Sequence, residues 1–147
     1  MRHQMKNLFS AIFLFSILFI VGCEDDATEV DPLVGTWELT SASMVIHSSP
    51  DTTVTYDVPN EVNITMVLAE DGSYAEAGTY EGEINSYSGT WSATGNVLTF
   101  VVTSGTEIDG TETWLNNYTL SGDVLTLVGE DEDDGVAETI TLVYARQ

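Results

Sequence analysis

From about residue 33 to the end, apolar and polar residues alternate with a period of two, the pattern of β-strands that bury one face. No stretch of this part repeats apolar residues at helical spacing. The segments that alternate, and the strands they predict, are 34–46, 62–69, 73–81, 86–93, 97–103, 112–120, 123–130 and 138–146. We therefore expect an all-β domain.

Short turn signals separate several of these segments. Asp71-Gly72, Gly95-Asn96 and Gly122-Asp123 suit the left-handed backbone of tight hairpins. An acidic run ending in Gly135 separates the last two segments. Strands that follow one another in sequence are thus expected to pair as antiparallel neighbours.

Large apolar side chains fall on one side of the predicted strands. They are Trp37, Leu39, Ile64, Met66, Leu68, Tyr74, Tyr80, Tyr87, Trp91, Leu98, Phe100, Val102, Trp114, Tyr118, Leu120, Leu125, Leu127, Ile140, Leu142 and Tyr144. The opposite side carries many threonines and is expected to face water. Eight antiparallel strands with one apolar face can close into an up-and-down barrel, which removes exposed edges. A two-sheet β-sandwich is the alternative.

The N-terminal segment has the order of a secretory signal. Arg2 and Lys6 precede an apolar stretch over residues 8–21, which is shorter than the ~20 residues needed to span a bilayer. The chain therefore divides into a signal peptide at 1–22, an acidic tether at 23–32 and a barrel domain at 33–147.

Cys23 is the only cysteine, so the chain cannot form an internal disulfide. The sequence Ile20-Val21-Gly22-Cys23 resembles the bacterial lipobox. That resemblance implies cleavage before Cys23 and fatty acylation, such as palmitate, of this residue. It places the protein at the bacterial cell envelope, anchored to the outer membrane. The acids at 24–26 either resemble export tags of surface-exposed lipoproteins or are a solvated linker.

Removal of the signal peptide leaves Arg146 as the only lysine or arginine, against 24 acidic side chains. Such a surface repels nucleic acid and favours a soluble monomer through self-repulsion. It suits salty surroundings, a basic protein partner or divalent cations. Charge alone does not choose among these three.

The start of the first strand carries a family signature. Gly35-Thr36-Trp37 is similar to the Gly-x-Trp opening of lipocalins, and more closely to small lipocalin-like domains of bacterial lipoproteins. The segments 71–74, 89–91 and 120–123 also resemble that group. The resemblance implies that Trp37 closes one barrel end with an arginine across it. Arg146, at the end of the last strand, is expected to make this cation–π contact.

An eight-stranded barrel either fills its interior with side chains or holds one small ligand. Residues that combine an apolar body with a polar tip are the candidate ligand contacts. They are Tyr74, Tyr80, Tyr87, Trp91, Trp114 and Tyr118. Glu76 has the same inward parity, where a carboxylate needs a partner or a ligand. The long connection at 47–61 is either a lid, with an extra strand at 52–56, or a surface excursion.

The acidic run raises weak calcium binding as a hypothesis. Glu130, Glu132 and Asp134 alternate before a glycine, as oxygen ligands do in calcium loops. No other cofactor is indicated. His47 is the only histidine left after processing, and no set of residues marks a catalytic site, so an enzyme is not expected.

Three functions remain from the sequence, of which an enzyme on the barrel, marked by a bound cofactor or a pocket carboxylate with a raised pKa, ranks last. The first is a lipid-anchored barrel at the cell envelope that binds a small hydrophobic or amphipathic ligand. The alternative is a filled barrel that recognises a basic protein partner, as an inhibitor or as a subunit of an envelope complex. An internal cavity distinguishes the first function from this alternative, because only the first needs one.

Overall fold

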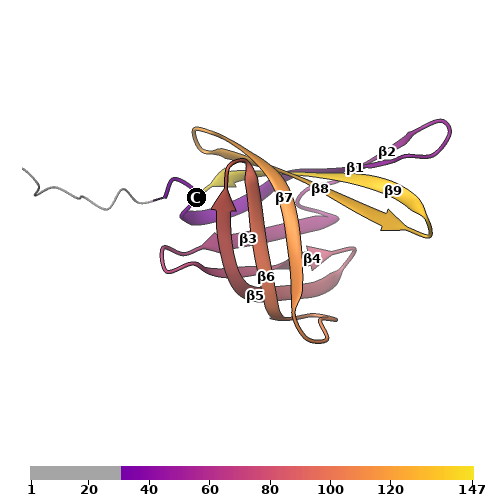
Figure 1. Cartoon of the computed structure of the whole chain (residues 1–147). Helices are drawn as coiled ribbons and strands as arrows, with labels where there is room; N and C mark the ends of the chain where they lie inside the picture. The colour runs from indigo at the N-terminus through magenta and orange to yellow at the C-terminus, as the bar shows by residue number, and fades with distance from the viewer. Residues whose placement is uncertain (1–30) are drawn as a thin grey trace, which may run out of the picture. The chain divides into compact units, whose positions relative to one another are not determined.

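The computed structural model describes residues 31–147, which form nine antiparallel strands in one sheet (Figure 1). The strands are β1 (Gly35–Ile46), β2 (Thr52–Tyr56), β3 (Val62–Leu68), β4 (Ser73–Tyr80), β5 (Glu83–Thr94), β6 (Val97–Gly105), β7 (Glu112–Ser121), β8 (Val124–Asp133) and β9 (Val136–Arg146). Over these residues there is no helix that is long and apolar enough to cross a membrane.

Eight of the strands close into a barrel. From β3 to β9 each strand pairs with the next, and β1 closes the ring by pairing with both β3 and β9. The prediction of an eight-stranded antiparallel barrel is confirmed, and the sandwich alternative is wrong. β2 is an additional strand that pairs only with β1, and it occupies the 52–56 segment that the sequence suggested.

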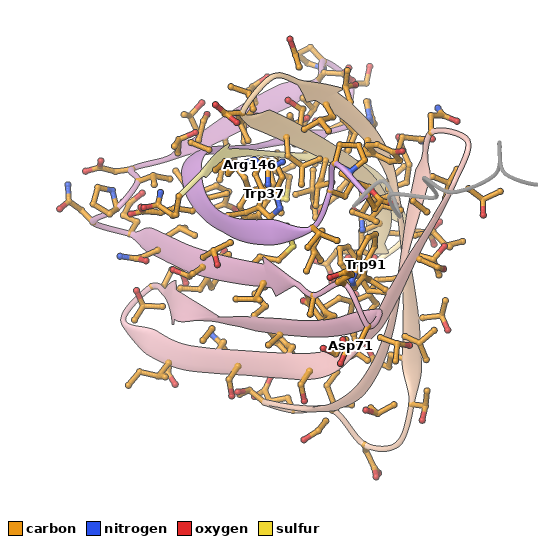
Figure 2. All side chains as sticks on the ribbon, turned by 90° about the vertical axis from the view of Figure 1, so that its left-hand side faces the viewer. Trp37, Asp71, Trp91 and Arg146 are labelled. Atoms are coloured by element: carbon orange, nitrogen blue, oxygen red, sulfur yellow. The ribbon has the colours of Figure 1, made fainter. Side chains whose placement is uncertain are left out.

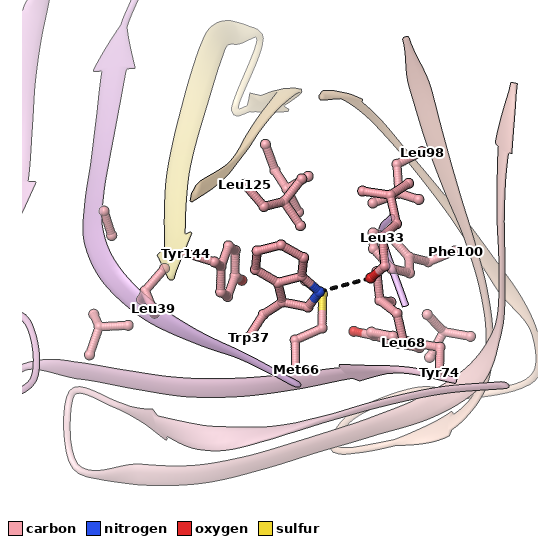
Figure 3. Close-up of a cluster of buried hydrophobic side chains, with 14 residues drawn as sticks. Leu33, Trp37, Leu39, Met66, Leu68, Tyr74, Leu98, Phe100, Leu125 and Tyr144 are labelled. Carbon is pink, nitrogen blue, oxygen red and sulfur yellow. Dashed lines mark hydrogen bonds between the residues drawn. The ribbon is translucent and has the colours of Figure 1, made fainter. Parts of the chain in front are cut away.

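Trp37 lies at the centre of the hydrophobic core and has no exposed surface. Its indole N–H donates a hydrogen bond to the carbonyl oxygen of Leu33 at 2.9 Å, so the strand that carries Trp37 and the segment before it are tied together (Figure 3). Buried apolar side chains from five barrel strands surround it: Leu39, Met66, Leu68, Leu98, Phe100, Leu125 and Tyr144. We call this end of the barrel the filled end.

Arg146 covers Trp37 at the filled end, as Figure 2 shows. Its guanidinium carbon lies 4.3 Å from the centroid of the indole ring, which is the contact predicted from the sequence. The guanidinium also donates to the carbonyl oxygen of Val34 at 2.8 Å and lies 3.3 Å from the carboxylate of Asp123. A Cβ atom at Gly35 would collide with this guanidinium. The glycine before Trp37 is therefore needed for the close approach of the last strand.

At the opposite end, two of the strand pairings stop early. β1 pairs with β3 only between residues 35–38 and 65–68. β7 pairs with β8 only between residues 117–121 and 124–128. Beyond these residues the strands diverge, and we call this end of the barrel the open end.

The strands that leave the barrel continue as an extension of the same sheet, which we call the arm. It consists of β2 with residues 42–46, 129–133 and 136–142. In Figure 1 the β1–β2 and β8–β9 hairpins project together from one side of the barrel.

The arm corrects the prediction that the strand beginning at residue 123 ends at residue 130. β8 continues through the acidic run to Asp133, and a tight turn at Asp134-Gly135 leads into β9. The acidic residues are compatible with a strand here because they are exposed and their backbone pairs with β9. Strand propensity depends on such context more than on residue type.

We predict that Trp37→Ala destabilises the protein by about 3–5 kcal/mol, the usual cost of deleting a fully buried aromatic ring. Urea denaturation followed by circular dichroism measures this. Leu115→Ala is the control, because Leu115 is 62% exposed and its truncation should change stability by no more than about 0.5 kcal/mol. Equal effects of the two substitutions would contradict the central role of Trp37.

Candidate ligand-binding site

A cavity of about 640 Å³ lies at the open end. It is placed where β7 and β8 diverge, and both strand edges contribute to its wall. The lining residues are Tyr74, Glu76, Phe100, Glu112, Thr113, Trp114, Leu115, Asn116, Leu127, Gly129, Glu130, Asp131, Ile140, Leu142 and Tyr144. The barrel is thus filled around Trp37 and hollow at its other end.

Small side chains contribute to this hollow. Gly129 is the next inward-facing residue of β8 after Leu125 and Leu127. It pairs with Ile140 of β9. A Cβ atom at Gly129 would lie 2.8 Å from the side-chain oxygen of Asn116. The Asn116 side chain therefore reaches across the gap between β7 and β8 to the space above Gly129.

Glu76 is the carboxyl group in the interior of the cavity. The Tyr74 hydroxyl donates a hydrogen bond to its Oε2 at 3.0 Å. Burial raises the pKa of the Glu76 carboxyl, and the hydrogen bond from Tyr74 opposes this rise only in part. Burial also raises the pKa of Tyr74 and of Tyr144, and the neighbouring Glu76 charge adds to both shifts. Both tyrosines are therefore neutral hydroxyls at pH 7.

Aromatic rings form two pairs beside this carboxyl group. The rings of Tyr74 and Phe100 have centroids 4.5 Å apart. Tyr87 and Trp114 meet edge to face, with centroids 5.1 Å apart and an interplanar angle of 76°. The indole N–H of Trp114 donates to the Glu112 carboxylate at 3.0 Å, which fixes the ring at the mouth of the cavity.

The structure brings together three of the six aromatic residues selected from the sequence as ligand contacts. Tyr74 and Trp114 line the cavity, and Tyr87 packs against Trp114. The alternation of inward and outward residues identified them because each lies within a strand, Tyr74 in β4, Tyr87 in β5 and Trp114 in β7.

The other three lie elsewhere. Tyr80 is 43% exposed, with its hydroxyl 3.4 Å from that of Tyr56. The indole N–H of Trp91 donates to the Ala69 carbonyl at 2.9 Å, close to the turn at Asp71 (Figure 2). Tyr118 packs against the core. Inward parity alone does not tell which end of a barrel a residue occupies.

Sequence reasoning missed six cavity residues: Glu112, Thr113, Leu115, Asn116, Gly129 and Asp131. Asn116 could have been predicted, because it is a polar residue at an inward position between Trp114 and Tyr118. The others line the cavity because β7 and β8 separate there. No local sequence pattern marks that separation.

The structure does not bring Glu130, Glu132 and Asp134 into a calcium loop. Glu130 and Glu132 lie on β8, and Asp134 lies in the turn after it. Within residues 31–147 no three His, Cys, Asp or Glu side chains are grouped closely enough to hold a metal ion. Cys23 and the signal peptide lie outside the described residues.

We predict that the raised pKa of Glu76 appears as a pH-dependent difference in stability. A carboxyl group with a raised folded-state pKa binds its proton more tightly when folded. Its stabilising contribution to the free energy of unfolding is therefore present below about pH 4.3, the pKa of a glutamate in the unfolded chain. This contribution is lost as pH rises through the pKa of Glu76 in the folded protein. Glu76→Gln has no proton to lose, so its free energy of unfolding should rise relative to the unmodified protein as pH increases above about 4.3.

Urea denaturation at a series of pH values measures this difference. Glu38→Gln is the matched control, because it removes one carboxylate from the exposed face of β1, and its effect should stay within about 0.5 kcal/mol. A Glu76→Gln difference that does not change with pH would contradict the burial of this carboxyl group.

Comparison with known families agrees with this geometry. The lipocalin-like domain family matches residues 33–127, which run from the segment before β1 into β8 and include the Gly-x-Trp sequence. Searches of curated proteins and of solved structures gave no match. Since the family match covers more than half of the chain, the protein belongs to the lipocalin-like domain family.

Proposed function

We propose that this protein binds a small hydrophobic or amphipathic ligand in the open-end cavity, and that a lipid on Cys23 holds it at the bacterial cell envelope. The observation that carries the proposal is the cavity of about 640 Å³. Its volume falls within the range of ~300–1,000 Å³ that is usual for small-molecule sites.

The lining supports an amphipathic ligand. Leu127, Ile140 and Leu142 offer apolar surface from β8 and β9, and Glu76 with Tyr74 offers a polar group in the interior. Polar and apolar groups contribute to the wall in nearly equal measure, which suits an amphipathic ligand better than a purely hydrophobic one. The hollow open end favours this function over the alternative of a filled barrel that acts only through its surface.

The N-terminal sequence supports the anchoring part of the proposal. Residues 1–22 have the order of a bacterial lipoprotein signal, and Ile20-Val21-Gly22-Cys23 has the form of its cleavage site. The chain enters the barrel at the filled end, where Leu33 packs against Trp37. The described part of the chain therefore begins at the end of the barrel opposite the cavity.

We predict that Gly129→Phe abolishes ligand binding without unfolding the barrel. The phenyl ring would enter the cavity, and the displaced Asn116 side chain can rotate away. Binding is measured with the neutral fluorescent dye Nile red, whose emission increases in apolar surroundings. Ala77→Phe is the control, because Ala77 is exposed on the other face of β4.

Dye binding should be lost in Gly129→Phe and kept in Ala77→Phe, with unchanged circular dichroism in both. Equal dye binding by the two variants would show that the dye occupies the surface, and the proposal would fail.

We also predict that Cys23→Ala leaves the protein without lipid. The thiol is the only acceptor for thioether-linked diacylglycerol in the chain, and stable membrane anchoring requires more than one acyl chain. The variant should move from the membrane to the soluble or unprocessed fraction, with a matching loss of mass. Unchanged fractionation and mass would contradict lipidation.

A further inference from the structure

The charge of the cavity limits the ligands that it accepts. Four carboxylates line it, on β4, β7 and β8: Glu76, Glu112, Glu130 and Asp131. No lysine, arginine or histidine is among the lining residues of this described part of the chain. A ligand with a carboxylate or phosphate would meet acidic side chains and no positive charge there, which costs binding free energy.

The two basic residues of the described chain are engaged elsewhere. Arg146 lies at the filled end, over Trp37 and beside Asp123. His47 lies on the arm, with its ring nitrogens 3.3 Å from the Asp51 carboxylate and 2.8 Å from the Thr139 hydroxyl. Neither residue is positioned to neutralise an anion inside the cavity.

Glu76 provides an acceptor for a positively charged group. Its Oε2 accepts the hydrogen bond from Tyr74. A half-buried carboxylate gains more from a cationic hydrogen-bond donor than from a neutral one. An ammonium group at this place would supply both the charge and the N–H donors.

The aromatic rings of the cavity suit the same kind of ligand. Tyr74, Phe100, Trp114 and Tyr144 contribute to its wall. Aromatic faces attract organic cations through their quadrupole, and tryptophan does so most strongly. These rings also accept the apolar part of an amphipathic molecule.

A bare metal ion does not fit this arrangement. The carboxylates are distributed around the wall, and in residues 31–147 no three acidic or histidine side chains converge on one point. An ion of calcium size needs several oxygen ligands at ~2.3–2.6 Å from a common centre. A positively charged ligand of this cavity would therefore be a larger molecule with an apolar body.

We infer that the cavity ligand is an organic cation, a protonated or quaternary amine with an apolar body, and that Glu76 binds its positively charged group. This inference rests on the proposed function, because it needs the cavity to be a binding site. The acidic surface of the protein would add to it by raising the local concentration of cations at the cavity mouth.

Three molecules with the same alkyl chain test the inference. Octylamine carries a positive charge at pH 7, 1-octanol is neutral and octanoate is negative. Isothermal titration calorimetry with the purified protein should give a dissociation constant for octylamine at least about tenfold lower than for 1-octanol. Octanoate should bind most weakly of the three.

The variants Glu76→Gln and Glu38→Gln distinguish the effect of a cavity carboxylate on octylamine binding from the effect of the overall negative surface charge. Each variant removes one carboxylate, but only the first removes it from the cavity. Glu76→Gln should weaken octylamine binding about ten- to a hundredfold, and Glu38→Gln should leave it unchanged. If Glu76→Gln fails to fold, Glu112→Gln at the exposed mouth replaces it, with an expected loss of about two- to fivefold.

The outcomes distinguish this inference from the proposed function. Octanol or octanoate binding as tightly as octylamine would overturn the cation preference and leave the cavity a binding site. Equal losses in the cavity variant and in Glu38→Gln would also overturn it, because surface charge would then explain the preference. If none of the three binds while Nile red does, the cation inference alone fails. If Nile red fails as well, the proposed function fails with it.

Discussion

The rest of this structure depends on the burial of Trp37, a residue of the first strand, beneath Arg146 of the last strand. The indole is held from one side by its hydrogen bond to the Leu33 carbonyl and from the other by the guanidinium of Arg146. Arg146 in turn donates to the Val34 carbonyl, so the two ends of the domain are joined at one place. Gly35 permits this approach because any side chain there would collide with the guanidinium.

The barrel is closed at the filled end, and its strands diverge at the open end. Since β1 leaves β3 after residue 38 and β8 leaves β7 after residue 128, the four strands of the arm separate from the rest of the barrel. The cavity lies at the second of these separations. Core packing and ligand space are thus divided between the two ends of one barrel, which lets the filled end supply stability while the open end remains hollow.

Much of the fold could be predicted because period-two alternation and turn glycines are local signals. The eight barrel strands, their antiparallel order and the contact of Arg146 with Trp37 follow from such signals and from the family resemblance. The site was predicted only in part. Tyr74, Glu76 and Trp114 have inward parity, but parity gives no position along the barrel axis, so Trp91 and Tyr118 were grouped with them. The cavity itself results from a pairing that ends at Val128, and pairing length depends on contacts between strands rather than on the sequence of either strand.

The central claim is that the open end binds a ligand and that the buried core at the filled end stabilises the barrel. Native mass spectrometry of the purified protein, after exposure to a lipid and metabolite extract of its source cells, tests this claim most directly. The account predicts a reproducible added mass that disappears on denaturation and whose fragmentation shows a nitrogen-containing amphiphile. Only bare protein under conditions that preserve non-covalent complexes would contradict it, and would indicate that the hollow between β7 and β8 is not a binding site.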